Sequence, residues 1–374
     1  MKKILYISQF WITELQGGAE LEAHDFCLRL MNQGFEVEVA TFSPPSEKQL
    51  PYPITYFPQV SDDFDTQFYH SLYKLREFLS VNYDRWDSII LFGNLLYNFS
   101  LPEMNSKTKF IARVWDLPHI FNTGWQDWPY SYIKDLYLVG TDYHVDAMNT
   151  HNISPKLSLP PANLSISKPI DFDYEEWKNR PYDFGFINPI PHKGISVVSG
   201  LISTLPNKSF LIKKGNYQYQ HMVDALDKWY SNVTVDCNYY DTMDHFYRQC
   251  RYILYPSLQE GFGMVTYEAM SQGCLVFAND HPIIRSATGE GPVYIDAYPQ
   301  QCNQNYTKYM KTNSTGQYNY DMESAVEEWK DVIEDTINDK NKVLSHIHKG
   351  LEAGARLQET TDLAYQKFYD YLSS

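Results

Sequence analysis

The sequence predicts an α/β protein built from two doubly wound, Rossmann-like domains that face a central cleft. The chain has 374 residues, which is longer than a typical domain with a single hydrophobic core and fits two domains of ordinary size. Short apolar runs alternate with helical patterns in both halves, as in parallel sheets with right-handed crossovers. A proline-rich stretch at 160–181 separates the two series and is the predicted hinge. We therefore predict domains at 1–165 and 166–354, with a C-terminal helix at about 355–374 that packs back on the first domain.

The first domain opens with a strand–helix–strand unit. In the segment after the first strand, Leu21, Leu28 and Met31 recur at helical spacing. Ala23 and Phe26 lie near the same stripe. The predicted elements of this domain are strands at 4–8, 36–41, 88–92, 109–114 and 135–139 and helices at 19–32, 66–81 and 143–150.

The second domain repeats this rhythm after the proline-rich stretch. Its predicted elements are strands at 184–187, 209–213, 233–235, 252–255 and 275–278 and helices at 195–205, 219–230 and 242–249. The segment 298–320 is rich in Asn, Gln and Tyr without periodicity, so we expect a long surface loop there. Helical patterning returns at 322–372.

The composition limits the class of partner and compartment. The chain has 31 basic and 46 acidic residues and a net charge of −15, which disfavours a dominant nucleic-acid surface but leaves a local one possible. The five cysteines form an odd set without C-x-x-C spacing, so we predict neither a disulfide framework nor a structural metal. The apolar run after Lys2-Lys3 is too short for a signal peptide, and no segment approaches the ~20 apolar residues that span a bilayer. We expect a cytoplasmic protein, or one peripheral at a membrane, without a transmembrane segment.

The segment Glu260–Glu268 carries the strongest functional pattern of the chain. It holds two carboxylates eight residues apart, with a glycine-rich turn between an apolar run and the start of a helix. The unpaired N–H groups and the dipole of a helix N-terminus favour a phosphate or diphosphate. Two carboxylates would not bind the diphosphate itself, but they can accept hydrogen bonds from hydroxyl groups, one carboxylate from those of a sugar and the other from those of a ribose. The segment therefore predicts a cradle for a nucleotide sugar.

Two further turns join a strand to a helix. Asn188–Gly194 carries Lys193 beside a helix N-terminus, where its ammonium can neutralise a diphosphate leaving group. A solvated turn lysine is the alternative, and the presence of Glu260–Glu268 in the same domain favours the functional interpretation. In the first domain, Gly17 and Gly18 lie before the first helix. Such a pair lets the backbone approach a ligand closely, or serves only as a turn into the helix.

Candidates for the acceptor side follow the strand at 109–114. Asp116 and His119 can contact the transferred sugar or an acceptor hydroxyl, although Trp-Asp-x-Pro is also a common way to leave a strand. Asp171 and Asp173 form the D-x-D pattern of metal-dependent sugar transferases. They lie in the predicted hinge and not after a buried strand, so we interpret the pattern as coincidental.

With these motifs the chain resembles the retaining glycosyltransferases of the GT-B fold, most closely family four, the glycosyl transferases group 1. The resemblance covers nearly the whole length. Tyr255–Gly273 is close to the family's signature, and Asn188–Gly194 looks like its phosphate turn. Gly17–Glu20 and Gly34–Val37 in the first half are also typical of the family. The resemblance implies the GT-B arrangement for the two predicted domains.

The resemblance also implies a role for each candidate residue. On the donor side, Glu268 would bind the ribose hydroxyls, and Glu260 and the backbone of Gly261, Phe262 and Gly263 would bind the donor sugar. The N–H groups of Met264 and Val265 would bind the diphosphate, and Lys193 would neutralise its charge. Gly17 and Gly18 would lie across the cleft from these residues. Two positions depart from the family. Its phosphate-turn arginine is here Asn188, which can donate hydrogen bonds but brings no charge. Its histidine-aspartate pair is here Trp115-Asp116, which leaves open whether His119 takes the place of that histidine.

The predicted activity is transfer of a hexosyl or pentosyl group from a nucleoside diphosphate sugar, with a UDP-sugar favoured, to an acceptor hydroxyl. The resemblance implies retention by front-face attack, in which the leaving phosphate oxygen takes the acceptor proton and Glu260 is not a nucleophile. No metal and no cofactor beyond the donor is expected. The expected acceptor is a glycan, a lipid-linked glycan or another polymer with a hydroxyl group. The alternatives are a catalytically weakened nucleotide-sugar binding protein, a hydrolase or epimerase of UDP-sugars, and a DNA-modifying sugar transferase of viral type.

Overall fold

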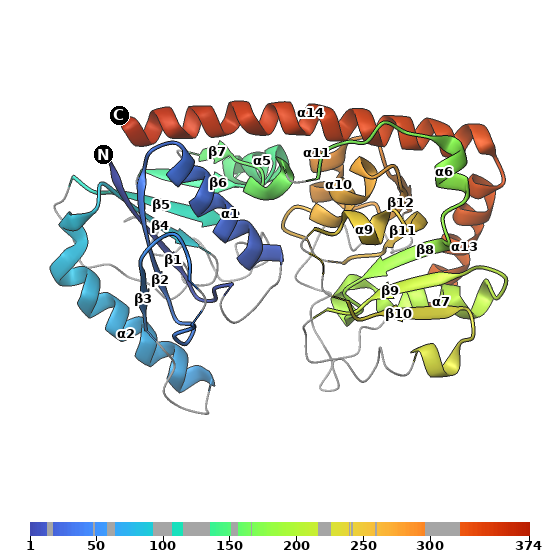
Figure 1. The fold of residues 1–374 in the computed structure, drawn as a ribbon, viewed down its shortest axis with the longest axis horizontal. Helices are drawn as coiled ribbons and strands as arrows, with labels where there is room; N and C mark the ends of the chain where they lie inside the picture. Colours follow the sequence, from blue (N-terminus) through green and yellow to red (C-terminus); the bar gives the residue numbers. More distant parts are fainter. Residues whose placement is uncertain are drawn as a thin grey trace. The chain divides into compact units, whose positions relative to one another are not determined.

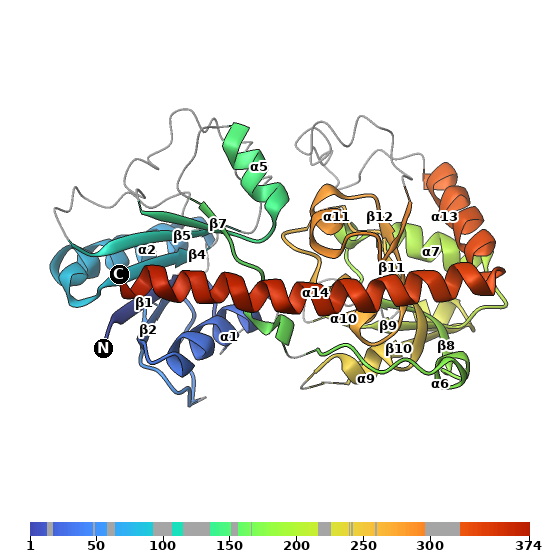
Figure 2. The ribbon, with the colours of Figure 1, turned by 90° about the horizontal axis from the view of Figure 1, so that it is seen from above.

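The computed structural model divides the chain into two compact units. Unit 1 comprises 1–163 and 361–374, and unit 2 comprises 164–360. The structure describes residues 1–12, 18–47, 49–57, 64–92, 107–114, 135–150, 156–165, 167–215, 226–238, 240, 242–258, 260–295 and 322–374. The last helix, α14 (Lys340–Ser373), is continuous, and its residues from 361 onward belong to unit 1 (Figure 2).

Unit 1 contains a seven-stranded parallel sheet in the order β3-β2-β1-β4-β5-β6-β7 (Figure 1). Its elements are β1 (Lys3–Ser8), α1 (Gly18–Asn32), β2 (Glu36–Thr41), β3 (Ile54–Tyr56), α2 (Phe64–Asn82), β4 (Ser88–Phe92), β5 (Lys109–Val114), β6 (Leu136–Val139), α5 (Asp142–Thr150) and β7 (Lys156–Ser158). Every strand and helix predicted for this half is confirmed. The sequence prediction missed β3 and β7, because each has three half-buried residues and lies at an edge of the sheet, where no apolar run is needed.

The buried face of α1 differs from the predicted stripe. Leu21 is exposed, and Leu28 and Met31 only pack on the margin of the core. The buried side chains on this helix are Ala23, Phe26, Cys27 and Leu30, together with the polar Glu22. The spacing of Leu21, Leu28 and Met31 predicted the helix, which is confirmed, but a second set at i, i+3, i+4 and i+7 satisfies the same helical period and forms the buried face.

A buried ion pair joins α1 to β5. The Glu22 carboxylate accepts hydrogen bonds from the guanidinium of Arg113 and, at 2.9 Å, from the backbone N–H of Ala162. Both charged side chains are almost fully buried, and the guanidinium carbon of Arg113 lies 4.0 Å from the centre of the Phe26 ring. A charge so far from water is tolerated only with a partner, so each member of the pair depends on the other.

Unit 2 contains a six-stranded parallel sheet in the order β10-β9-β8-β11-β12-β13. Its elements are α6 (Tyr174–Lys178), β8 (Tyr182–Ile187), a 3₁₀ turn (Pro191–Lys193), α7 (Ile195–Thr204), β9 (Phe210–Lys213), β10 (Val233–Asp236), α9 (Asp244–Tyr247), β11 (Cys250–Tyr255), α10 (Met264–Ser271), β12 (Leu275–Asn279), α11 (Pro282–Thr288), β13 (Val293–Ile295), α13 (Met322–Ile337) and the first part of α14. The predicted strands are confirmed, while α6, α11 and β13 were not predicted. The predicted loop at 298–320 lies outside the described residues, as does most of the predicted helix at 219–230.

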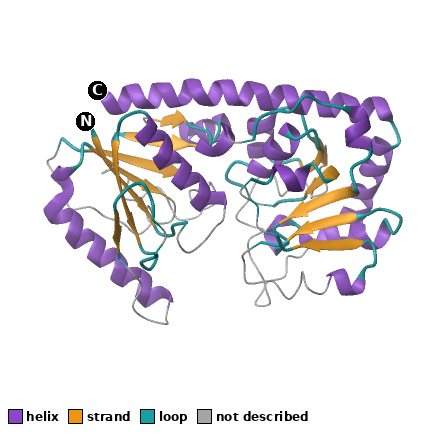
Figure 3. Ribbon diagram, viewed as in Figure 1, coloured by secondary structure: helices purple, strands orange, loops and turns teal. Residues whose placement is uncertain are grey.

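Helices cover both faces of the second sheet, which makes it doubly wound (Figure 3). One face packs on α7, α13 and the start of α14, with Trp329 fully buried at its centre. The other packs on α9, α10 and α11, where Tyr247 and Ile284 are fully buried. Successive residues of a strand point to opposite faces, so Leu254 of β11 joins the first cluster and Tyr255 joins the second.

The first residues of unit 2 are held on α10. The hydroxyl of Tyr267 lies 2.7 Å from the carbonyl oxygen of Leu164 and 3.1 Å from that of Ser167. The N–H of Ile170 donates to the carbonyl of Ser271 at 2.9 Å. This part of the predicted hinge is therefore fixed to unit 2, and the hinge itself stays a prediction.

Candidate functional site

Two turns of unit 2 lie side by side at the carboxyl ends of β8 and β11, which are neighbouring strands. The N–H of Leu258 donates to the carbonyl of His192 at 2.9 Å and so joins the turns. Gly194 has φ 85°, and a Cβ at this position would lie 2.3 Å from the carbonyl oxygen of Pro256. Only glycine permits both the left-handed backbone and this approach. The described residues of the two turns, 188–194, 256–258 and 260–263, therefore lie against each other.

A helix N-terminus opens at this surface. Gly263, with φ 89°, precedes α10 and offers no side-chain cap. Among the described residues, the N–H groups of Met264 and Val265 have no backbone or side-chain partner within hydrogen-bond distance. The first N–H groups of a helix and its dipole attract an anion, so the geometry of a phosphate site is present.

Lys193 and Glu260 face each other across the two turns. The Lys193 Nζ donates to Glu260 Oε1 at 2.6 Å, and the Glu260 side chain is only 7% exposed. Burial by itself would raise the pKa of Glu260. The charge and hydrogen bond of Lys193, together with hydrogen bonds from Ser257 and Tyr255, outweigh burial, so the pKa of Glu260 is lowered. Glu260 is therefore an ionised, paired carboxylate at neutral pH.

Glu268 lies one turn into α10 in a different environment. Its Oε2 accepts a hydrogen bond from the hydroxyl of Tyr247 at 2.6 Å. Burial raises the pKa of Glu268 to about 7, the Tyr247 hydrogen bond opposes that rise and the nearby charge of Asp244 adds to it. The two carboxylates of the motif therefore differ: Glu260 stays charged, whereas Glu268 titrates near neutral pH.

Asn188 occupies the start of the first turn with unusual geometry. Among the residues that the structure describes, Asn188 is the one non-glycine residue with a positive φ, at 58°. Its N–H donates to the carbonyl of Lys213 at 3.1 Å. Its Oδ1 is buried and has no hydrogen-bond partner among the described residues. Asparagine tolerates this backbone region better than most residues, and a buried amide oxygen without a protein partner suits a position that contacts a hydrogen-bond donor of a ligand.

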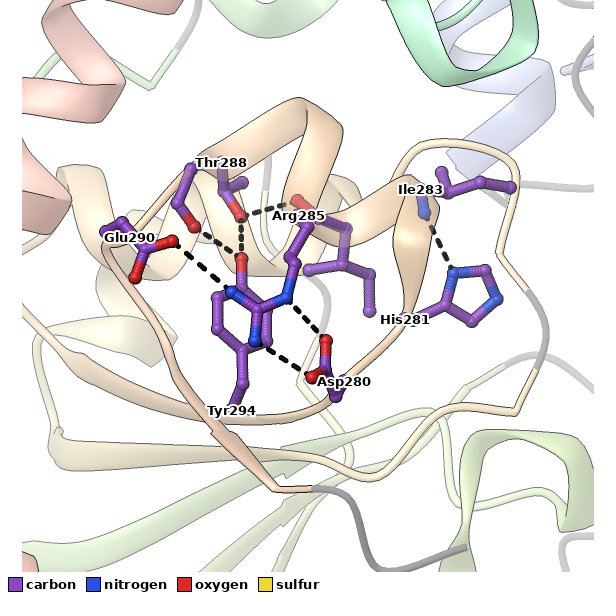
Figure 4. A network of polar contacts seen from close by, with 9 residues as sticks. Asp280, His281, Ile283, Arg285, Thr288, Glu290 and Tyr294 are labelled. Carbon is purple, nitrogen blue, oxygen red and sulfur yellow. Dashed lines mark hydrogen bonds and ion pairs between the residues drawn. The ribbon is translucent and has the colours of Figure 1, made fainter. Parts of the chain in front are cut away.

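A polar network joins α11 to the residues on either side of it and to β13 (Figure 4). Arg285 binds both carboxylate oxygens of Asp280, at 2.6 and 2.9 Å, and Glu290 at 3.3 Å, and its guanidinium lies 4.1 Å from the centre of the Tyr294 ring. A Cβ built on Gly263 would lie 3.4 Å from Ile284 of α11. The network therefore fixes the helix that packs behind the glycine turn.

The structure brings part of the predicted site together. The residues gathered around the two turns and α10 are Asn188, Lys193, Glu260, Gly261, Phe262, Gly263, Met264, Val265 and Glu268. Gly18 is the first residue of α1 in unit 1. Gly17, Trp115, Asp116 and His119 lie outside the described residues. Sequence reasoning missed Tyr247, which lies in no motif and is one of 31 tyrosines in the chain. It also gave no role to Tyr255, although this residue begins the segment that resembles the family's signature.

The D-x-D pattern has a structural role. Asp173 is the N-cap of α6, and its Oδ1 accepts from the N–H groups of Glu175 at 2.7 Å and Glu176 at 3.2 Å. Within the described ranges, no group of three or more His, Cys, Asp or Glu side chains is arranged to hold a metal ion. The carboxylate of Asp173 is thus occupied by the helix that it begins.

Replacing Asp173 with alanine is expected to lower the free energy of unfolding by about 1 kcal/mol, because two N–H groups of α6 lose their acceptor. Urea unfolding monitored by tryptophan fluorescence measures the change. The exposed neighbour Asp171 is the matched control, and its alanine variant should stay within about 0.5 kcal/mol of the wild type. A loss of metal-dependent activity in the Asp173 variant, at unchanged stability, would contradict the capping role.

Comparison with known proteins identifies what this fold and these turns are similar to. Residues 181–341 match the sequence profile of the family described as Glycosyl transferases group 1. A curated relative is the UDP-N-acetylglucosamine–peptide N-acetylglucosaminyltransferase GtfA subunit of Streptococcus parasanguinis, which is 25% identical over 156 residues. That match spans 36% of this chain and 31% of the relative. The chain thus matches about a third of that protein's length.

Solved structures resemble the whole chain. Sucrose-phosphate synthase of Thermosynechococcus elongatus gives a TM-score of 0.70 at 14% identity and covers 100% of this chain and 99% of its own. WaaG, a glycosyltransferase of lipopolysaccharide biosynthesis, gives 0.68 at 13% identity, with 96% and 99% covered. HepE of Anabaena, solved with UDP and glucose, gives 0.65 at 14% identity, with 100% of both chains covered. These similarities confirm the predicted fold class, GT-B with two parallel α/β sheets.

Proposed function

We propose that the chain is a retaining glycosyltransferase of the glycosyl transferases group 1 family, whose profile matches residues 181–341, and that it moves a sugar from a nucleoside diphosphate donor to an acceptor hydroxyl. The observation that carries this proposal is the surface formed by the two turns. It combines a helix N-terminus for an anion, a lysine paired with a buried carboxylate, and a second carboxylate one turn into α10. A nucleoside diphosphate sugar offers a matching set of groups, namely a diphosphate for the helix N-terminus and the lysine, and sugar and ribose hydroxyls for the two carboxylates.

The proposed donor is a UDP-sugar. HepE is solved with UDP-glucose, and the pneumococcal O-GlcNAc transferase GtfA is solved with UDP and GlcNAc. In this chain the N–H groups of Met264 and Val265 would bind the diphosphate, and Glu268 would accept hydrogen bonds from the ribose hydroxyls. Glu260 and the glycine turn at 261–263 would bind the sugar. Asn188, in place of a cation, would donate a hydrogen bond from its amide.

In the proposed reaction, Lys193 is the main group that stabilises the charge of the leaving diphosphate. As the bond between the anomeric carbon and the diphosphate breaks, negative charge develops on the leaving oxygen, and Lys193 and the start of α10 stabilise it. That oxygen accepts the proton of the acceptor hydroxyl, which attacks from the same face. Glu260 is a poor nucleophile because Lys193, Ser257 and Tyr255 already hold its charge. No metal and no cofactor enters the proposal.

The proposed acceptor is a hydroxyl of a glycan, a lipid-linked glycan or another polymer. The curated relative's printed name describes transfer to a peptide, so a serine- and threonine-containing peptide belongs in the acceptor panel. No helix among the described residues combines the length and apolar character of a membrane span. The net charge of −15 disfavours nucleic acid as acceptor, and the cytoplasm is the proposed location.

An assay with UDP-, GDP- and ADP-sugars and the acceptor panel tests the proposal. The expected result is acceptor-dependent release of UDP, with the anomeric proton of the product showing the same configuration as in the donor by NMR. Release of free sugar without an acceptor would identify a hydrolase instead. Binding without turnover on every acceptor would identify a weakened, non-catalytic relative.

The affinity for a UDP-sugar is expected to fall roughly tenfold from pH 8 to pH 6. The free protein holds Glu268 with a pKa of about 7, whereas ribose hydroxyls that donate to the carboxylate would lower this pKa in the complex. Binding then releases a proton below pH 7, so affinity rises with pH up to about 8 and levels off. Calorimetric titration with a UDP-sugar measures this, because the diphosphate of the sugar ester keeps a constant charge over the range. A Glu268→Gln variant should show a flat profile, and an equally steep profile in that variant would contradict the assignment.

A further inference from the structure

Tyr247 contacts the carboxylate that is proposed to bind the donor ribose. Its hydroxyl donates to Glu268 Oε2 at 2.6 Å, while Oε1 of the same carboxylate has no hydrogen bond to the described residues. Tyr247 is fully buried, whereas Glu268 is only partly buried. One oxygen of the carboxylate is therefore held from the protein side, and the other remains open to a ligand.

The position of the Tyr247 hydroxyl is itself fixed by several contacts. The backbone carbonyl of Tyr247 accepts from the Sγ of Cys274 at 3.2 Å and from the guanidinium of Arg180 at 3.5 Å. Its ring packs edge-on to Phe246, with ring centres 5.8 Å apart. Because both the backbone of Tyr247 and its buried ring are held by these contacts, the hydroxyl cannot move away from Glu268 unless the core repacks.

A second contact joins the same two helices one turn further on. The Nε of Arg248, next to Tyr247, donates to Oε1 of Gln272 at 2.8 Å. Gln272 lies four residues after Glu268, so the two contacts stack along one face of α10 and its C-terminal end. The pair fixes the rotation of α10 against α9, and with it the direction in which Glu268 leaves the helix.

We propose that Tyr247 is a positioning residue for donor binding, which holds Glu268 so that its Oε1 is presented to both ribose hydroxyls. This inference rests on the proposed function. A hydroxyl that donates to a carboxylate stabilises the ionised form, and only the ionised form can accept from two donors without a competing proton. Tyr247 thus orders the rotamer of Glu268 and favours its charged state before the donor arrives.

Tyr247→Phe tests the proposal because phenylalanine keeps the ring packing and removes the hydroxyl. In the ligand-free protein, carbon-13 NMR of labelled glutamate carboxyls should show Glu268 titrating at higher pH than in the wild type, with Glu268→Gln identifying the signal. The UDP-sugar affinity at pH 7 should fall roughly tenfold, the effect expected for losing a hydrogen bond to a charged group. It should recover partly at pH 9, where Glu268 is ionised in both proteins. In the Glu268→Gln background, Tyr247→Phe should add little to the loss of affinity.

Tyr365→Phe is the matched control. Tyr365 is also fully buried and donates to a backbone carbonyl, that of Pro160 at 3.2 Å, but it lies in unit 1. Its variant should change stability and leave the pH profile unaltered. If Tyr247→Phe leaves both the titration of Glu268 and the affinity unchanged, the positioning role is wrong and the proposed function stands. If the wild type binds no nucleoside diphosphate sugar, the proposed function is wrong and the positioning role fails with it.

Discussion

Replacing Lys193 with alanine is expected to lower the transfer rate by about 10²–10³-fold, the range for removing one preorganised group that stabilises developing negative charge. In the family's phosphate turn an arginine usually stands where this chain has Asn188, so here Lys193 is the one lysine or arginine in the turn 188–194. In the proposed mechanism its loss leaves the diphosphate with the helix N-terminus and the uncharged amide of Asn188. Steady-state kinetics with a UDP-sugar and its acceptor measures the effect.

Two companion variants separate catalysis from folding. Lys193→Ala leaves the buried carboxylate of Glu260 without its counter-charge, which by itself destabilises unit 2. The double variant Lys193→Ala/Glu260→Gln should regain stability but not rate. Lys178→Ala removes an exposed lysine of the same unit and should change neither. A double variant with wild-type rate would show that Lys193 serves only to neutralise Glu260.

The second large effect concerns the stability of unit 1. Glu22→Ala is expected to lower its free energy of unfolding by about 3–5 kcal/mol, because Arg113 remains buried without the carboxylate. Replacing both residues, as Glu22→Leu/Arg113→Met, should recover most of this loss. Amide hydrogen exchange of β4 and β5 reports the stability of unit 1 separately from unit 2.

The comparison between these two variants is the decisive one. If the double variant is as unstable as Glu22→Ala, the unpaired charge of Arg113 is not the cause of the loss. A cost of Glu22→Ala below about 1 kcal/mol would show that water or backbone movement rescues Arg113.

Much of the fold follows from local patterns in the sequence. The buried parallel strands are continuous apolar runs such as 252–255, and turn residues mark their ends, so their positions are predicted well. Edge strands fail this test, because β3, β7 and β13 are only three residues long and the residues of β3 and β7 are half-buried. The buried face of α1 fails for another reason. Two stripes share the helical period, and the choice between them depends on tertiary packing that the sequence does not display.

The candidate site divides in the same way. Lys193 and Glu260 lie 67 residues apart, yet each follows a strand end, and neighbouring parallel strands bring such turns together. Tyr247 follows no such rule. It acts through a hydroxyl directed at a carboxylate on another helix, and only the packing of α9 against α10 reveals that contact. The opposite pKa shifts of Glu260 and Glu268 likewise depend on burial and partners that a motif does not encode.

We propose that the turns of unit 2 and the start of α10 bind a nucleoside diphosphate sugar. Isothermal titration of the wild type and of Glu268→Ala with UDP-glucose and UDP-N-acetylglucosamine at pH 8 tests it most directly. We expect one site per wild-type chain and at least tenfold weaker binding in the variant, since the ribose hydroxyls lose a charged acceptor. Absence of binding by the wild type to any nucleoside diphosphate sugar, or equal affinity in the two proteins, would contradict it.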